Sequence, residues 1–184
     1  MPKDGTPLTA PSEEAGRIGL ALAKAEGAAY GLALEHMTRL VAAFGEVRSA
    51  GEYQIALALE KAEGLYVYRG GYLEWQEPGD ATLHIEVAVR DAADGRFIPG
   101  LTVHAQIQHE SGSEVASLVL PFLWHPTLYH YGQNVRAPAG ARITVKVRID
   151  PPPFLRHDKV NGRRYADPAE TRFGPIELDF LGSN

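Results

Sequence analysis

The chain of 184 residues fits one domain, or one domain with an extension, and its 45% hydrophobic and 22% charged residues are typical of a globular protein. Cysteine is absent, which excludes disulfides, catalytic thiolates, iron–sulfur clusters and thiolate zinc sites. A metal site therefore has to use histidine, carboxylate, methionine or backbone oxygen, and a net charge of -5 does not favour a nucleic-acid-binding protein.

The spacing of apolar residues in the N-terminal part of the chain predicts a helix. We expect a flexible N-terminus over residues 1–11 and a helical extension over 12–48, because apolar residues recur at steps of three and four between 12 and 45. Ser12 is placed to cap the helix. The apolar stripe contains Ile18, Leu22, Ala25, Ala29, Ala33, Met37, Leu40 and Phe44, and we expect the helix to pack on the sandwich through Ile18, Leu22, Met37, Leu40 and Phe44.

From residue 52 the apolar period changes to two, which indicates β-strands. Strands are expected within 53–59, 65–75 around a Gly70-Gly71 turn, 83–89, 101–107, 115–120, 143–149 and 176–180. Short strands without helices between them predict a mainly β protein, with an antiparallel β-sandwich as a domain over residues 49–184. The stretches 121–141 and 150–172 lack this alternation, and we expect them to be long, functional loops.

The strand around His84 brings an imidazole and a carboxylate to one face. Residues two apart in a strand point to the same side, so His84 and Glu86 point together while Leu83, Ile85 and Val87 face the core. For this pair alone two interpretations stay open, a ligand pair or an exposed polar face. His104, on the next strand, is interpreted as a solvated or hydrogen-bonded histidine.

Three more histidines fall in the two expected loops. The segment 122–135 holds His125 and His130 among four aromatic residues, and this apolar character predicts that the segment packs and fixes both imidazoles. Farther on, a proline run at 151–153 precedes His157, which Asp158 is placed to orient. Each histidine taken singly is equally compatible with a structural role.

Together these motifs resemble the bacterial periplasmic iron-transport protein family, in order and spacing, over residues 52–181. The resemblance implies an immunoglobulin-like β-sandwich, often a homodimer, with a copper or iron site built from His84, Glu86, His130 and His157. It also implies uptake of ferrous or ferric iron through a membrane permease, and a periplasmic location. The motifs that carry it are His84-Ile85-Glu86, His130-Tyr131-Gly132-Gln133-Asn134, and the run from Pro151 to Lys159 followed by Asn161-Gly162.

The chain departs from the family pattern at a soft ligand. Members carry Met-Pro-Met shortly before the His-Tyr-Gly motif, whereas this chain has Leu120-Pro121-Phe122. Losing a thioether shifts the expected preference toward Cu(II), Zn(II) or iron, so the identity of the metal stays open. His125, or Met37 from the helix, are the further candidates for the missing position.

Three functions are compatible with these observations. The first is a non-catalytic metal-binding protein for iron or copper, and the second a metal-dependent enzyme in which His84, Glu86 and His130 leave a coordination position open for water. The third is a structural or interaction domain without metal. Because imidazoles bind metal as the neutral base, we expect affinity to fall as the pH drops through about 6.5.

The location and assembly are also open at this stage. The N-terminus does not resemble an export signal, which predicts a cytoplasmic protein if the chain is complete, whereas the family resemblance implies the periplasm. A homodimer follows mainly from the resemblance. It gains support from an aromatic group that is expected to be exposed, made of Tyr66, Tyr68, Tyr72 and Trp75.

Overall fold

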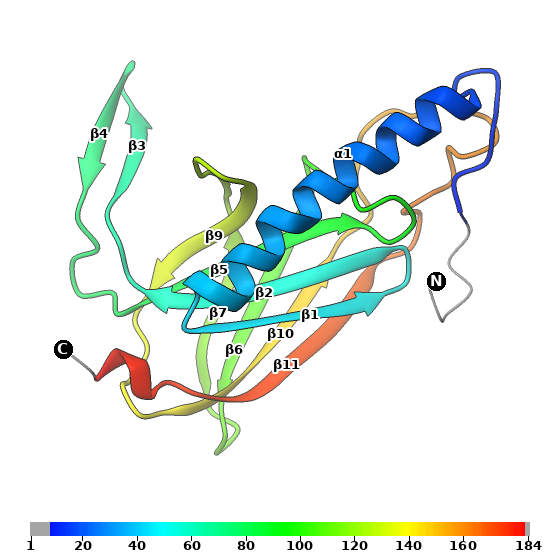
Figure 1. The fold of residues 1–184 in the computed structure, drawn as a ribbon. Coiled ribbons are helices and arrows are strands. Elements are labelled where there is room, and N and C mark those ends of the chain that lie inside the picture. Colours follow the sequence, from blue (N-terminus) through cyan, green and yellow to red (C-terminus); the bar gives the residue numbers. More distant parts are fainter. Residues whose placement is uncertain (1–7, 183–184) are drawn as a thin grey trace.

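Two antiparallel sheets pack face to face in the computed structural model, which describes residues 8–182 (Figure 1). In spatial order, the first sheet consists of β1 (Phe44–Ala50), β2 (Tyr53–Lys61), β5 (Leu83–Asp91), β9 (Tyr129–Val135) and β8 (Phe122–Trp124). The second consists of β11 (Ala169–Glu177), β10 (Arg142–Ile149), β6 (Val103–His109) and β7 (Glu114–Leu120). This arrangement confirms the predicted antiparallel β-sandwich.

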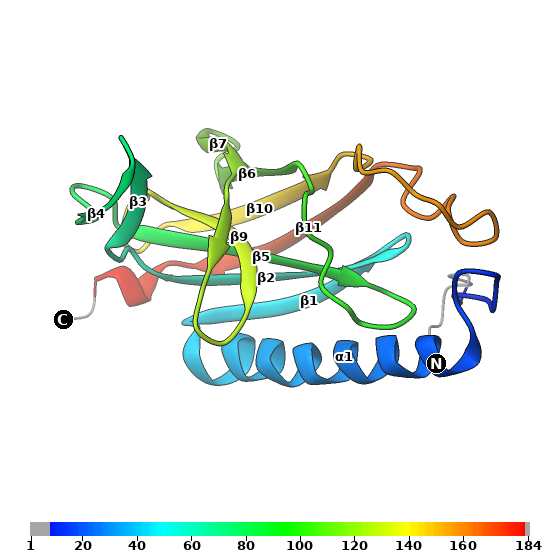
Figure 2. The ribbon, with the colours of Figure 1, turned by 90° about the horizontal axis from the view of Figure 1, so that it is seen from above.

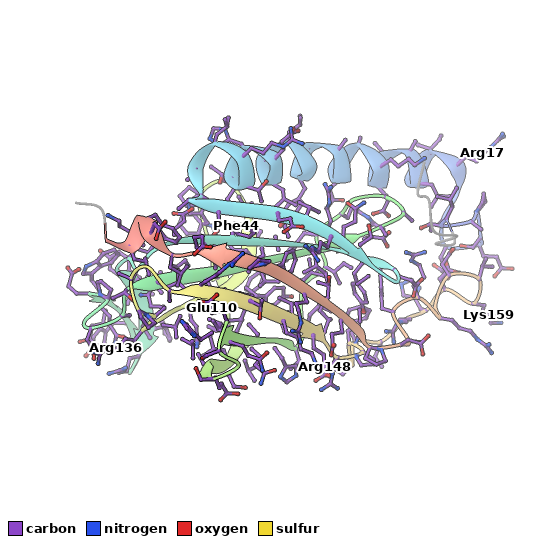
Figure 3. All side chains as sticks on the ribbon, turned by 90° about the horizontal axis from the view of Figure 1, so that it is seen from below. Arg17, Phe44, Glu110, Arg136, Arg148 and Lys159 are labelled. Atoms are coloured by element: carbon purple, nitrogen blue, oxygen red, sulfur yellow. The ribbon has the colours of Figure 1, made fainter. Side chains whose placement is uncertain are left out.

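The core lies between the two sheets, where apolar side chains fill the space (Figure 3). On β5, Leu83, Ile85 and Val87 face inward as the alternation predicts, and all three are fully buried. A separate hairpin of β3 (Leu65–Arg69) and β4 (Tyr72–Gln76) projects away from both sheets (Figure 1). The last element of the described range is the short helix η2 (Asp179–Leu181).

The predicted helix is shorter than its apolar pattern. Helix α1 (Arg17–His36) begins after Gly16, not at Ser12, and it ends in one π-helical turn, η1 (Met37–Val41). Phe44 already belongs to β1, where it pairs with Leu59 of β2, because the backbone becomes extended at Ala42. No helix in the described range has the length and apolar character needed to cross a membrane. Residues 1–7 of the expected flexible N-terminus lie outside the described residues.

Helix α1 lies along the outer face of the first sheet (Figure 2), and the predicted stripe packs on the sheet only in part, at Ala33 and Met37. Ile18, Leu22 and Leu40 are 80%, 66% and 76% exposed, so that part of the prediction is wrong. The buried positions are instead Gly27 and Leu34. The reason is steric: the helix comes so close to the loop after β5 that only a small residue fits there, and large side chains turn outward.

One of the two expected loops contains strands. Residues 121–141 include β8 and β9, and β9 pairs along β5 from Leu83↔Val135 to Val87↔Tyr131. The alternation is hidden in the sequence because His130, Tyr131 and Gly132 are all buried, so both faces of β9 are covered. The stretch 150–172 is irregular up to Ala169, close to expectation.

A pair of glycine substitutions tests how α1 is seated. A Cβ at Gly27 would lie 1.9 Å from the carbonyl oxygen of Asp94, whereas no described atom lies within 4 Å of one at Gly19. We expect Gly27→Ala to lower the free energy of unfolding by about 1–3 kcal/mol through overpacking. Gly19→Ala should raise it by up to about 1 kcal/mol, because alanine favours helix. Urea unfolding measures both, and equal effects would contradict this packing.

Candidate metal centre

The site begins as a row of neighbouring residues on the outer face of the first sheet. His84 pairs with Glu60 of β2 on one side and with Asn134 of β9 on the other. In the next row Glu86 lies between Ala58 and Gly132. Directly paired residues share a face of a sheet, so the side chains of these residues lie together on the outer face. The side chain of His130, two residues before Gly132, lies on the same face.

The end of the helical segment buries this face. Leu34 and Met37 pack on Ala56, Ala58 and Ala88 of the sheet and on Leu128 of the loop before β9. His84 is only 1% exposed, and Glu86 and His130 are also buried. The interpretation of an exposed polar face is therefore wrong, because β5 is covered on both sides.

Three side chains from two strands converge here. The Nε2 atoms of His84 and His130 lie 3.7 Å and 3.4 Å from Oε1 of Glu86. One ligand atom from each of the three residues lies within 4.8 Å of the other two. In a tetrahedral site with bonds of about 2.0–2.1 Å, ligand atoms are about 3.3 Å apart, so small side-chain adjustments would seat one ion. The residues present fit a transition-metal ion.

The metal-free cluster carries unused hydrogen-bonding groups. Among the described residues, Nε2 of His84 and both ring nitrogens of His130 are buried without a hydrogen-bond partner. A buried polar group left unsatisfied costs about 1–3 kcal/mol, which ion binding would recover. Such an arrangement is expected where the protein holds ligands ready for a cation.

Burial also changes the protonation of the cluster. Burial, with smaller contributions from the Glu60 and Glu63 carboxylates, raises the pKa of Glu86 to about 8. Burial, with the charges of His84 and His125, lowers the pKa of His130 to about 4. At neutral pH His130 is therefore a free base, and the proton that an ion has to displace sits mainly on Glu86. The expected competition near pH 6.5 does not apply to His130.

A small cavity opens beside the cluster, with a volume of about 110 Å³. Glu86 and His130 form one part of its wall, and Met37 from η1 forms another. His125, the other candidate for the missing ligand, lines it too, and its ring centre is 6.2 Å from that of His130. The other ionisable residues on its wall are His36, Glu60 and Glu63.

Comparison with known proteins identifies the family of this chain. The Fe2+ transport protein family matches residues 72–180. The chain belongs to the Fe2+ transport protein family. No curated protein sequence matches the chain.

Solved structures share the fold with this family member. FetP of uropathogenic Escherichia coli strain F11 is 20% identical with a TM-score of 0.58, over 73% of this chain and 91% of FetP. Copper-reconstituted P19 of Campylobacter jejuni is 16% identical with a TM-score of 0.57, over 70% of this chain and 90% of P19. At these identities the likeness shows the fold.

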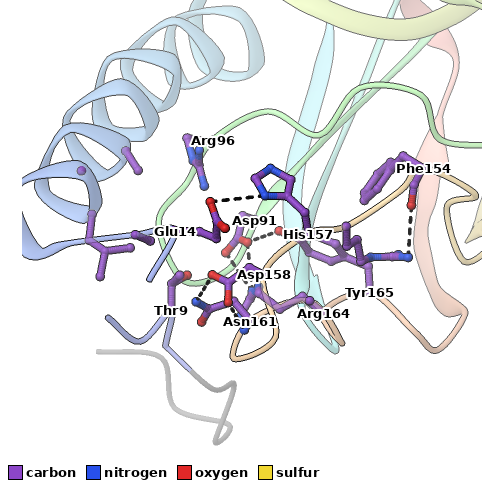
Figure 4. A pocket seen from close by; sticks show the side chains of 16 residues that line it. Thr9, Glu14, Asp91, Arg96, Phe154, His157, Asp158, Asn161, Arg164 and Tyr165 are labelled. Carbon is purple, nitrogen blue, oxygen red and sulfur yellow. Dashed lines mark hydrogen bonds and ion pairs between the residues drawn. The ribbon is translucent and has the colours of Figure 1, made fainter. Parts of the chain in front are cut away.

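The structure does not bring His157 to the three-residue cluster. His157 is 87% exposed and lies at the opposite end of α1, where its Nδ1 is 3.4 Å from a carboxylate oxygen of Glu14 (Figure 4). A helix of 20 residues spans about 30 Å. Asp158 does not orient His157 but bonds to Ser12 and Asn161. Of the four metal ligands that the family resemblance implied, the structure brings together only His84, Glu86 and His130.

Asn134 is a site residue that the sequence motif contained without a role. Its Nδ2 donates to the carbonyl oxygen of Glu63 at 2.7 Å, and its Oδ1 accepts from the Glu63 backbone N–H at 3.3 Å. These two bonds fix the amide orientation, so Oδ1 also faces Nδ1 of His84, 2.8 Å away. An oxygen can only accept, so Nδ1 of His84 donates this bond and Nε2 is the ring nitrogen that faces Glu86. The sequence contained a signal for this role, because Asn134 lies two residues after Gly132 and therefore on the same face of the strand.

Replacing Asn134 tests this positioning role. We expect Asn134→Ala to lower metal affinity by about 10- to 100-fold, because His84 loses its orienting acceptor. In ¹⁵N NMR spectra of the metal-free wild type, His84 should show the Nδ1–H tautomer alone, and the variant should show both. Asn134→Asp loses the bond to the Glu63 carbonyl but keeps an oxygen that accepts from Nδ1 of His84, so it should retain the wild-type tautomer. An unchanged tautomer in Asn134→Ala would contradict the assignment.

Proposed function

We propose that this protein is a non-catalytic binding protein for a transition-metal ion, iron or copper, with His84, Glu86 and His130 as its ligands. The observation that carries the proposal is the buried cluster itself, in which one carboxylate oxygen lies within 4 Å of two unsatisfied imidazole nitrogens. Membership of the Fe2+ transport protein family supports iron, and the copper-containing P19 structure supports copper.

The size of the cavity favours an ion as cargo over an organic substrate. Small-molecule pockets usually have volumes of about 300–1,000 Å³. The cavity beside Glu86 has about 110 Å³, which is room for an ion with a few water molecules. An imidazole–carboxylate set accepts Fe(II), Cu(II) and Zn(II), so the class of metal follows from the ligands while the choice among them does not.

Metal titration of histidine variants tests the proposal. Calorimetry with Cu(II), Zn(II) and anaerobic Fe(II) should show one ion per chain. Affinity should fall by about 100-fold or more in His84→Ala and in His130→Ala, because each loses a ligand. His157→Ala is the matched control, since His157 lies at the other end of α1, and it should bind as the wild type does. Binding that survives the loss of both His84 and His130 would exclude this site.

We extend the proposal to location and partner. The protein acts in the periplasm and passes its ion to a membrane permease for iron uptake. The support is family membership, together with a fold shared with FetP, whose structure comes from protein expressed in the periplasm.

We also propose a homodimer formed through the β3–β4 hairpin. Tyr66 pairs with Trp75 and Tyr68 with Leu73, so these four side chains share one face of the hairpin. All four are exposed. Aromatic residues are enriched in the buried cores of protein interfaces, and a two-stranded sheet leaves both edges open for a second copy.

Light scattering of hairpin variants tests the dimer. The wild type should have the mass of two chains at micromolar concentration, and Tyr68→Ser combined with Leu73→Ser should have the mass of one, because the shared apolar face is lost. Tyr72→Ser, which changes the opposite face of the hairpin, is the control. A monomeric wild type would remove this proposal.

A further inference from the structure

Met37 brings sulfur to the wall of the cavity beside the cluster. The chain has two methionines and no cysteine, so Met37 and Met1 carry its only sulfur. Met37 is buried and lines the same cavity as Glu86 and His130. The end of α1 therefore brings a soft donor to a site otherwise made of imidazole and carboxylate.

The backbone around Met37 is held firmly. It starts the π-helical turn η1, which the bond from the Ala42 N–H to the Met37 carbonyl closes at 2.9 Å. The Thr38 hydroxyl donates to the Leu34 carbonyl at 2.8 Å. Strand β1 passes so close that a Cβ at Gly45 would lie 2.0 Å from the Thr38 carbonyl oxygen. These contacts fix the direction in which the side chain of residue 37 leaves the helical segment.

Packing alone does not account for this residue. Met37 rests on the small side chains Ala56, Ala58 and Ala88, yet the cavity remains beside it. The sulfur-bearing side chain thus lies between the apolar floor and a cavity whose wall is mostly polar and ionisable. The cavity wall also includes His130, whose two ring nitrogens have no hydrogen-bond partner among the described residues.

We propose that the Met37 thioether is a ligand of this site and that it makes the site competent for a soft monovalent ion, Cu(I), together with His84 and His130. This inference rests on the proposed function. Thioether and imidazole are neutral donors that suit Cu(I), whereas Zn(II) is bound by imidazole and carboxylate with little gain from a thioether. The π-helical turn thus carries a selectivity-determining residue that comes from the segment before the first strand.

Selective loss of soft-metal binding tests the inference. Met37→Leu keeps the size and apolar character of the side chain and removes the sulfur. In competition with chromophoric chelators, we expect it to lower affinity for Cu(I), and for Ag(I) as its redox-inert analogue, by about 10- to 100-fold. Affinity for Zn(II) should stay within about threefold of the wild type. His84→Ala should lose affinity for all three ions.

X-ray absorption provides a direct second measurement on the unchanged sequence. Selenomethionine-labelled protein loaded with one Cu(I) per chain should show copper scattering at the selenium edge, and the signal should vanish in labelled Met37→Leu, which retains only the selenium of residue 1. Equal Cu(I) and Ag(I) affinities in wild type and Met37→Leu, or no copper–selenium scattering, would overturn the role of Met37 and leave the His84–Glu86–His130 site intact. Binding unaffected by His84→Ala would instead overturn the proposed function.

Discussion

The arrangement of the outer face of the first sheet depends on the burial of a carboxyl group between two imidazoles. Glu86 and its two histidine neighbours carry unsatisfied or protonated groups in the metal-free protein, which costs stability. The apolar core between the two sheets is extensive and independent of this face, so the fold tolerates the cost. An ion at this position would turn the same groups into a satisfied cluster.

The cover over that face requires small residues beneath it. Ala56, Ala58 and Ala88 form the floor on which Leu34 and Met37 rest. Gly132 completes the floor beside Glu86, where an added Cβ would lie 2.6 Å from the carbonyl oxygen of Ile85. Larger side chains in these rows would hold the helix away and let water reach the cluster. The alanine and glycine residues of these rows therefore determine how far water is excluded from the cluster.

The site combines a part that the family shares with a part that lies before the matched range. His84, Glu86 and His130 fall within residues 72–180, whereas α1, η1 and β1 do not. FetP and P19 align over 91% and 90% of their own lengths but over only 73% and 70% of this chain. The helical segment thus lies before the range that the family matches, and its end covers the candidate metal centre.

The sequence by itself determined the sandwich and the shared face of His84 and Glu86, because both follow from the two-residue period of a strand. It also marked His130, through a motif. Only the tertiary structure decided that His157 lies at the far end of α1, that β9 is a strand, and which face of α1 is buried. These features depend on how closely segments distant in sequence approach, as at Gly27 and Asp94, and local periodicity carries no information on such distances. The tertiary structure also places Met37 on the wall of the same cavity as His130, where β1 packs closely against the π-helical turn.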